Sequence, residues 1–189
     1  MSTIAVVQKN SSICIVSESL TTFGSTKLDG SFKFGDSKIL QWGNSLIGIV
    51  GDVAMKMIFL DLIETREEPD FSNRMAVFRF FTALHKELKE EYYINPNEEE
   101  DDPVESSQYE IVIANKHGIF GVHSLREVYH FNKYWAYGSG RDFALGAMHA
   151  LYNQDEMTAR QIAIAGVSAG MTFDDGSGGK LQVHTVELE

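Results

Sequence analysis

Hydrolysis at neutral pH is most often carried out by histidine, by cysteine or by a metal-bound water. The chain holds six histidines and one cysteine. His85 and His149 fall on expected helices and the others on expected strands or in a turn, so none forms the i, i+4 pair of a metalloprotease. Cys14, in the apolar run 13–16, is the only cysteine, which excludes an internal disulfide and a C-x-x-C metal site. We therefore interpret the histidines as core or surface residues and predict no metal.

Two loops rich in glycine and serine could also do chemistry. Gly138-Ser139-Gly140 stands between an expected strand and an expected helix, where a dinucleotide-binding loop would lie. However, Phe143 occupies the place of the third glycine and the expected sheet is largely antiparallel, so we predict no nucleotide and no other cofactor. The second loop, residues 174–179 with the sequence Asp-Asp-Gly-Ser-Gly-Gly, follows the last expected helix.

The composition is typical of one compact acidic domain over residues 1–189. With 43% hydrophobic residues, a chain of 189 residues can bury about 70% of its unfolded surface. The net charge of −11 and the lack of a basic run exclude nucleic acid and anionic membranes as partners. No stretch has the roughly 18 apolar residues of a membrane span, and we expect the mature chain to start at or next to Met1. The single cysteine indicates a reducing, cytoplasmic location.

The order of the expected elements positions the two loops. β-branched runs between turn residues predict strands, and apolar residues at helical spacing predict helices. We expect strands over 3–7, 12–16, 38–42 and 45–50, helices from Val53 and over 77–88, strands over 109–114, 118–123 and 128–137, helices over 140–152 and 158–169, and a last strand over 181–186. The acidic block 98–102 predicts a solvated loop. This order is typical of an α+β domain with sheets packed between helical layers.

Five short motifs, in order along the chain, resemble those of proteasome β-subunits and HslV-type peptidases. Ser2-Thr3-Ile4 is similar to the Thr-Thr-Ile opening of the mature family, and Thr21-Thr22-Phe23-Gly24 resembles its Thr-x-Gly segment. Residues 47–51 resemble the family's Ala-Gly-Phe-Ala-Gly, residues 138–140 its Gly-Ser-Gly, and residues 174–179 its Asp-x-x-Ser-Gly-Gly. The resemblance covers nearly the whole chain and implies a four-layer α-β-β-α sandwich of the N-terminal-nucleophile hydrolase class.

The resemblance also implies that Ser2, exposed by removal of Met1, is the nucleophile of an endopeptidase in the threonine-protease family. A free α-amine has a pKa of about 7.7 to 8.0, so it can accept the proton of its own residue's hydroxyl without a histidine. Lys38 takes the place of the lysine that lowers the pKa of the nucleophile and of the amine, and Glu18 takes the place of the carboxylate that holds this lysine.

The remaining site positions and the partners follow from the same resemblance. The backbone N–H of Gly51 would bind the oxyanion of the tetrahedral intermediate, and Ser139, Asp174 and Ser177 would orient the N-terminal amine. The implied partners are a peptide or unfolded protein as substrate, further copies of the chain in a homo-oligomeric ring, and an ATPase regulator.

The register of the N-terminus decides which hydroxyl is the nucleophile. The family's usual threonine and aspartate are replaced here by Ser2 and by the longer Glu18. Counting from Thr3 instead would place Ser17 at the carboxylate position, so Ser2 is the consistent choice.

The lysine and the activity have alternatives. Extra residues precede Lys38 compared with the family, so Lys33 competes for the lysine role. A catalytically inactive structural subunit and a hydrolase of small amides are the rival functions. The acidic block and the terminal residues 186–189 are candidate contacts with partners.

Overall fold

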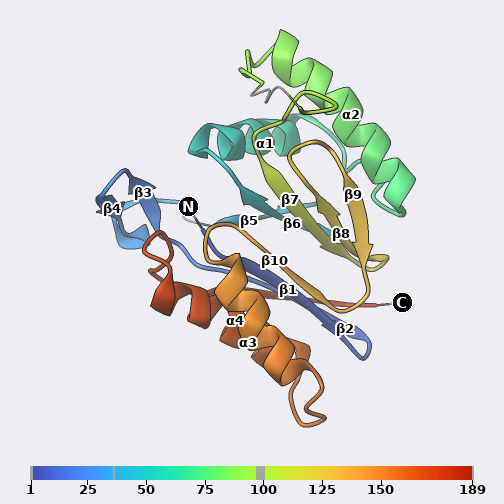
Figure 1. The fold of residues 1–189 in the computed structure, drawn as a ribbon. Helices are drawn as coiled ribbons and strands as arrows, with labels where there is room; N and C mark the ends of the chain where they lie inside the picture. Colours follow the sequence, from blue (N-terminus) through green and yellow to red (C-terminus); the bar gives the residue numbers. More distant parts are fainter. Residues whose placement is uncertain (1, 36, 97–100, 189) are drawn as a thin grey trace.

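A computed structural model describes residues 2–35, 37–96 and 101–188 and places them in four stacked layers (Figure 1). A pair of helices covers the outer face of each of two antiparallel sheets, so the layers follow one another as helix, sheet, sheet and helix. The predicted α+β class and the α-β-β-α sandwich are confirmed.

The sheet that carries the N-terminus has the strand order β10-β1-β2-β11 and is antiparallel throughout. Its strands are β1 (Ile4–Lys9), β2 (Ser12–Ser17), β10 (Tyr134–Tyr137) and β11 (Gln182–Glu187). Because β1 and β11 both pair with β2, the first and last strands of the chain are brought into one sheet.

The second sheet has the strand order β5-β6-β7-β8-β9 and is also antiparallel. Its strands are β5 (Ile39–Trp42), β6 (Ser45–Val50), β7 (Glu110–Asn115), β8 (Gly118–Val122) and β9 (Val128–Phe131). The chain leaves this sheet after β6, forms two helices and returns as β7. The end of β6 therefore lies beside the start of β7.

Four helices form the outer layers: α1 (Val53–Thr65), α2 (Arg74–Glu90), α3 (Arg141–Tyr152) and α4 (Ala159–Phe173). Side chains cap three of their N-termini, since Asp52, Asn73 and Thr158 each accept a hydrogen bond from a backbone N–H of the first turn. Thr158 also forms a capping box with Gln161. In none of the described helices are the length and the apolar content sufficient for a membrane crossing.

The segment 128–137, expected as one strand, forms two strands in different sheets. β9 pairs with β8, whereas β10 pairs with β1 of the other sheet. The prediction of a single strand was wrong because aromatic residues continue on both sides of the bend at Asn132 and Lys133, so the pattern does not reveal the change of sheet.

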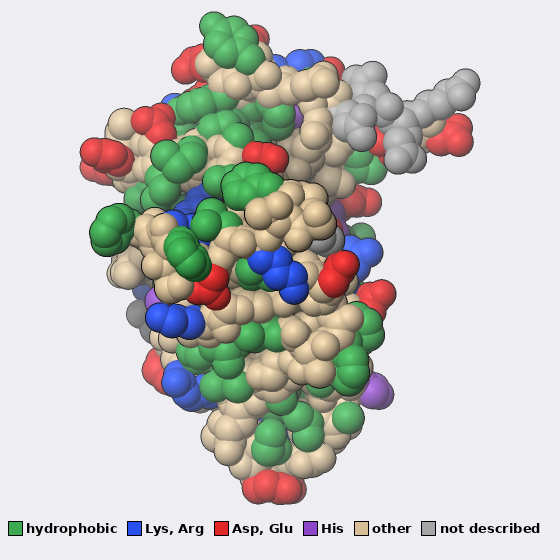
Figure 2. Space-filling view, turned by 90° about the vertical axis from the view of Figure 1, so that its left-hand side faces the viewer, with side chains coloured by type: hydrophobic (Ala, Val, Ile, Leu, Met, Phe, Trp, Pro, Cys, Tyr) green, Lys and Arg blue, Asp and Glu red, His purple; other side chains and the backbone are tan. Residues whose placement is uncertain are grey.

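A short hairpin that the sequence did not predict follows β2. It consists of β3 (Thr21–Phe23) and β4 (Thr26–Leu28), and a 3-10 turn (Gly30–Phe32) follows it. Figure 2 shows this side of the molecule, where hydrophobic side chains lie exposed beside charges of both signs. Phe23 and Phe34 are among the exposed aromatic residues of this region.

Side chains alternate along β1 between two buried environments. Ile4 and Val6 pack between the two sheets, whereas Ala5 and Val7 pack with residues of α3 and α4. Full burial of an aliphatic side chain contributes about 1.5 to 3 kcal/mol, so β1 is anchored on both faces. The side chains of Ser2 and Thr3, just before this strand, therefore point in opposite directions.

The predicted acidic loop, the predicted start at Met1 and the terminal segment 186–189 fall partly outside the described residues. The acidic block includes residues 98–100, which are not described, and its described members Asp101 and Asp102 belong to neither helix nor strand. Met1 and Glu189 also lie outside the described residues.

Candidate active site

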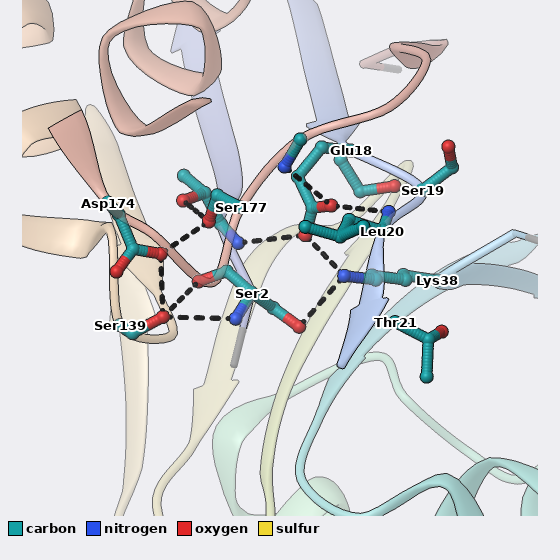
Figure 3. Close-up of polar contacts among 12 residues, drawn as sticks. Ser2, Glu18, Ser19, Leu20, Thr21, Lys38, Ser139, Asp174 and Ser177 are labelled. Atoms are coloured by element: carbon teal, nitrogen blue, oxygen red, sulfur yellow. Dashed lines mark hydrogen bonds and ion pairs between the residues drawn. The ribbon is translucent and has the colours of Figure 1, made fainter. Parts of the chain in front are cut away.

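The hydroxyl and the backbone nitrogen of Ser2 have partners on different sides of the residue (Figure 3). Its hydroxyl oxygen accepts a hydrogen bond from Nζ of Lys38 at 3.1 Å, and its backbone nitrogen donates to Oγ of Ser139 at 3.1 Å. The residue is only 6% exposed, so both contacts are shielded from bulk water. A hydroxyl next to a cation, with its own nitrogen held nearby, is an arrangement that favours a nucleophile.

The carboxylate of Glu18 stands behind this lysine. It forms an ion pair with Nζ of Lys38 and also accepts three backbone N–H bonds, from Thr3 at 3.2 Å, Leu20 at 2.7 Å and Gly178 at 3.2 Å. An ionised carboxylate is an acceptor with about four lone-pair sites, so these four donors occupy it fully. Glu18 thus connects the N-terminal residues, the corner after β2 and the loop after α4 to the lysine.

A second carboxylate, Asp174 at the end of α4, organises the other side of the nucleophile. Its Oδ2 accepts hydrogen bonds from Oγ of Ser139 at 2.7 Å and from Oγ of Ser177 at 2.6 Å. Because an ionised carboxylate cannot donate, both serines donate to it, and the Ser139 hydroxyl also makes a longer contact of 3.4 Å with the carbonyl oxygen of Ser2. Ser139 therefore has only lone pairs left for the nitrogen of Ser2, which must donate to it.

The loop before α3 allows this close approach of backbone to backbone. Gly138 has a φ of 95°, and a Cβ added there would lie 2.1 Å from the carbonyl oxygen of Ser2. The N–H of Gly140 donates to the same carbonyl at 3.2 Å. Glycine is thus required at position 138 for both conformation and space.

The electrostatics of the site centre on Lys38. Burial lowers the pKa of Lys38 from its ordinary value, the pair with Glu18 offsets part of this effect, and the nearby charge of Lys33 lowers the pKa further. The ammonium therefore releases its proton more readily than an exposed lysine. Its charge also acts on the Ser2 hydroxyl where water screens it poorly.

Comparison with solved structures decides the family. The chain is similar to the bacterial proteasome-like protein BPH of Thiobacillus denitrificans, at 36% identity and a TM-score of 0.93, over 99% of this chain and 98% of that chain. The chain belongs to the family of proteasome β-subunits and HslV-type peptidases. BPH in complex with epoxomicin matches at 36% identity and a TM-score of 0.92, over 99% of both chains. HslV from Trypanosoma brucei, at 18% identity, shares the fold with a TM-score of 0.68, over 98% of this chain and 99% of that chain.

No protein-family model matches the chain, and no curated protein sequence does. Membership therefore rests on the likeness to BPH over nearly the whole length of both chains.

Most of the site positions implied by the family resemblance meet in one hydrogen-bonded network. The six joined residues are Ser2, Glu18, Lys38, Ser139, Asp174 and Ser177. Gly51 lies outside this network of described residues. It follows β6 with a φ of 154°, and a Cβ added there would lie 3.1 Å from Cβ of Tyr109. Its part in binding an oxyanion stays a prediction.

The alternatives that the sequence left open differ clearly in this proteasome-like fold. Nζ of Lys33 donates to Oγ1 of Thr21, whereas Lys38 contacts Ser2. The hydroxyl of Thr3 is fully buried and lies 2.6 Å from Oγ of Ser177. Geometry thus favours Ser2 and Lys38 for the roles that Thr3 and Lys33 contested.

Sequence reasoning missed Gln182 and considered Thr3 only as a rival nucleophile, although both side chains contact the network. Oε1 of Gln182, on β11, accepts from Oγ of Ser17 at 3.3 Å and from the backbone N–H of Lys38 at 3.2 Å. The alternation along β1 could have revealed Thr3, but Gln182 depends on the pairing of β11 with β2. Among the described residues, no three His, Cys, Asp or Glu side chains gather as they would around a metal ion.

Proposed function

We propose that this proteasome-like peptidase subunit cleaves peptide bonds with Ser2 as its N-terminal nucleophile, after removal of Met1. The observation that carries the proposal is the pair of contacts on Ser2, with Lys38 on its hydroxyl and Ser139 on its nitrogen. Removal of Met1 turns this nitrogen into an α-amine with an ordinary pKa near 8, which can act as the base. The nucleophile and its base then belong to one residue.

The reaction would proceed in two halves. Oγ of Ser2 attacks the carbonyl carbon of the peptide while its proton passes to the α-amine, and the charge of Lys38 stabilises the developing alkoxide. The N–H of Gly51 would be a donor to the oxyanion of the intermediate. As the C–N bond breaks, the ammonium returns its proton to the leaving amine. Water activated by the same amine then hydrolyses the ester and restores Ser2.

We also propose that copies of the chain assemble into a closed homo-oligomeric ring that confines the substrate, with an ATPase as regulator. The membership of the family supports this assembly by analogy. Sedimentation at several protein concentrations is expected to give one large species, and a monomer at micromolar concentration would contradict the ring.

Covalent labelling tests the nucleophile. BPH, the related protein, has been solved in complex with the inhibitor epoxomicin. An epoxyketone has two electrophilic carbons, so a hydroxyl and a free amine of one residue can both react with it. We expect intact mass spectrometry to show loss of Met1 and one added inhibitor, and peptide mapping to place the adduct on Ser2.

A matched pair of variants completes the test. Ser2→Ala should abolish labelling and the cleavage of a fluorogenic peptide, whereas Ser25→Ala, at an exposed serine in the β3–β4 turn, should leave both unchanged. Retention of Met1 with no labelling of the wild-type protein would instead identify an inactive structural subunit. Turnover of simple amides without cleavage of peptides would identify a small-amide hydrolase.

A further inference from the structure

Thr3 occupies a position in the site that the resemblance does not assign. Its side chain is fully buried and its Oγ1 lies 2.6 Å from Oγ of Ser177. Its backbone N–H donates to Oε1 of Glu18 at 3.2 Å. One residue therefore contacts both halves of the network around its neighbour Ser2, the half that holds the lysine and the half that holds the nitrogen.

The direction of the hydrogen bonds can be worked out from proton counts. Asp174 takes the only proton of Ser177, so Ser177 has only lone pairs to offer Thr3. The hydroxyl of Thr3 must then be the donor. The resulting chain runs from Thr3 to Ser177 and on to Asp174, which also accepts from Ser139, the partner of the Ser2 nitrogen.

The surrounding backbone leaves a space that fits this side chain. A Cβ added to Gly140, before α3, would lie 2.0 Å from Oγ1 of Thr3, and one added to Gly170, in α4, would lie 2.4 Å from the same atom. Two helices thus approach Thr3 closely because both present glycine. A β-branched residue in this space has few rotamers, so its hydroxyl is held toward Ser177.

We propose that Thr3 is a positioning residue for the N-terminal nucleophile. The hydroxyl of Thr3 keeps the O–H of Ser177 directed at Asp174, and Asp174 in turn holds Ser139 against the nitrogen of Ser2. Without this donor, the Ser177 oxygen loses a hydrogen bond that fixes its rotamer, so its O–H is held less firmly against Asp174. Asp174 then loses one of the two hydroxyl groups that fix its carboxylate, so the position of its other partner, Ser139, is less well defined. The inference rests on the proposed function, because it concerns the nitrogen that acts as base.

Thr3→Val and Thr3→Ser separate the hydroxyl from the packing. Valine keeps the branched shape and removes the donor, whereas serine keeps the donor and removes the methyl group. For cleavage of a fluorogenic peptide we expect Thr3→Val to lower kcat about tenfold, the equivalent of one hydrogen bond, with KM unchanged. Thr3→Ser should retain most of the wild-type kcat. Equal losses in both variants would show a packing role only and would overturn the proposal.

A double-variant cycle tests the route through Ser177. If Thr3 acts through that hydroxyl, Thr3→Val should cost nothing further in a Ser177→Ala background. Additive losses would contradict the proposal, as would a Thr3→Val enzyme with wild-type kcat. Thermal unfolding followed by circular dichroism identifies any variant that has lost its fold, and Thr3→Ser then decides the question. A wild-type protein without peptidase activity or labelling would refute the proposed function itself, an outcome distinct from these.

Discussion

Replacement of Glu18 by glutamine tests how the two halves of the site depend on one buried charge. The carboxylate is completely buried, and the side chain of its partner Lys38 is 12% exposed. Glutamine has almost the same shape but carries no charge, and its amide NH2 must face one pair of the four donors. At the Oε2 position it would face the N–H groups of Leu20 and Gly178, and at the Oε1 position those of Lys38 and Thr3.

The expected loss of free energy of unfolding can be bounded from known costs. Removing one partner of a buried ion pair typically costs about 3 to 5 kcal/mol. The part due to the lysine is limited, since neutralising a lysine of ordinary pKa at pH 7 costs about 4.6 kcal/mol, and burial has already lowered the pKa of Lys38. We therefore expect Glu18→Gln to lower the free energy of unfolding by about 3 to 5 kcal/mol.

Urea unfolding at pH 7, followed by tryptophan fluorescence at one fixed protein concentration, measures the change. Glu87→Gln is the matched control, because its pair with Arg66 is partly exposed and should contribute less than about 1 kcal/mol. Adding Lys38→Met to Glu18→Gln removes the orphaned cation and should recover at least about 1 kcal/mol. A loss below about 1 kcal/mol in Glu18→Gln, or a double variant less stable than Glu18→Gln alone, would refute the reasoning.

Three further predictions concern packing, a buried hydroxyl and pH. Gly170→Ala should destabilise the protein in thermal unfolding by about 1 to 3 kcal/mol, because the new Cβ would lie 2.4 Å from the buried hydroxyl of Thr3. Gly146→Ala, on α3 with open space around it, should instead stabilise the protein by up to about 1 kcal/mol. Tyr109→Phe should raise the free energy of unfolding by about 1 kcal/mol, since the buried hydroxyl makes no hydrogen bond of good geometry among the described residues. Tyr137→Phe should not, because its hydroxyl has a histidine partner at 3.3 Å. Because the pKa of Lys38 is lowered on folding, the unfolded chain binds that proton more tightly. The wild type should therefore gain stability relative to Lys38→Met in urea unfolding as the pH rises toward the ordinary lysine pKa of 10.5.

Much of the fold could be predicted because its signals are local. The hairpin of β1 and β2 and the pair of β5 and β6 each consist of apolar runs around short turns, and helical spacing marks the four helices. The separation of β9 from β10 has no such local signal, because the choice of sheet depends on which strand edge is available. One strand over 128–137 and two shorter strands in the same segment would show the same alternation of side chains, so the sequence does not separate them.

The sequence predicted which residues belong to the candidate site better than it predicted the contacts among them. Order along the chain pointed to Ser2, Asp174 and Ser177 through resemblance. In the structure, Ser139 links the nitrogen of Ser2 to Asp174, which also contacts Ser177. That the longer Glu18 still reaches its lysine depends on where the corner after β2 lies, which no residue pattern specifies. The same holds for Gln182, whose neighbours are set by the pairing of the last strand.

The long sequence separations within the network have a consequence for the making of the protein. Ser2 and Ser139 are 137 positions apart, Glu18 and Gly178 are 160 apart, and Thr3 and Ser177 are 174 apart. Because synthesis proceeds from the N-terminus, the first residues leave the ribosome long before the segments that surround them exist. The nitrogen of Ser2 therefore stays without its partner until Ser139 has been made, and Glu18 and Thr3 lack theirs until Ser177 and Gly178 have been made. The complete network can therefore form only after the segment around Gly178 has been made, late in the synthesis of the chain.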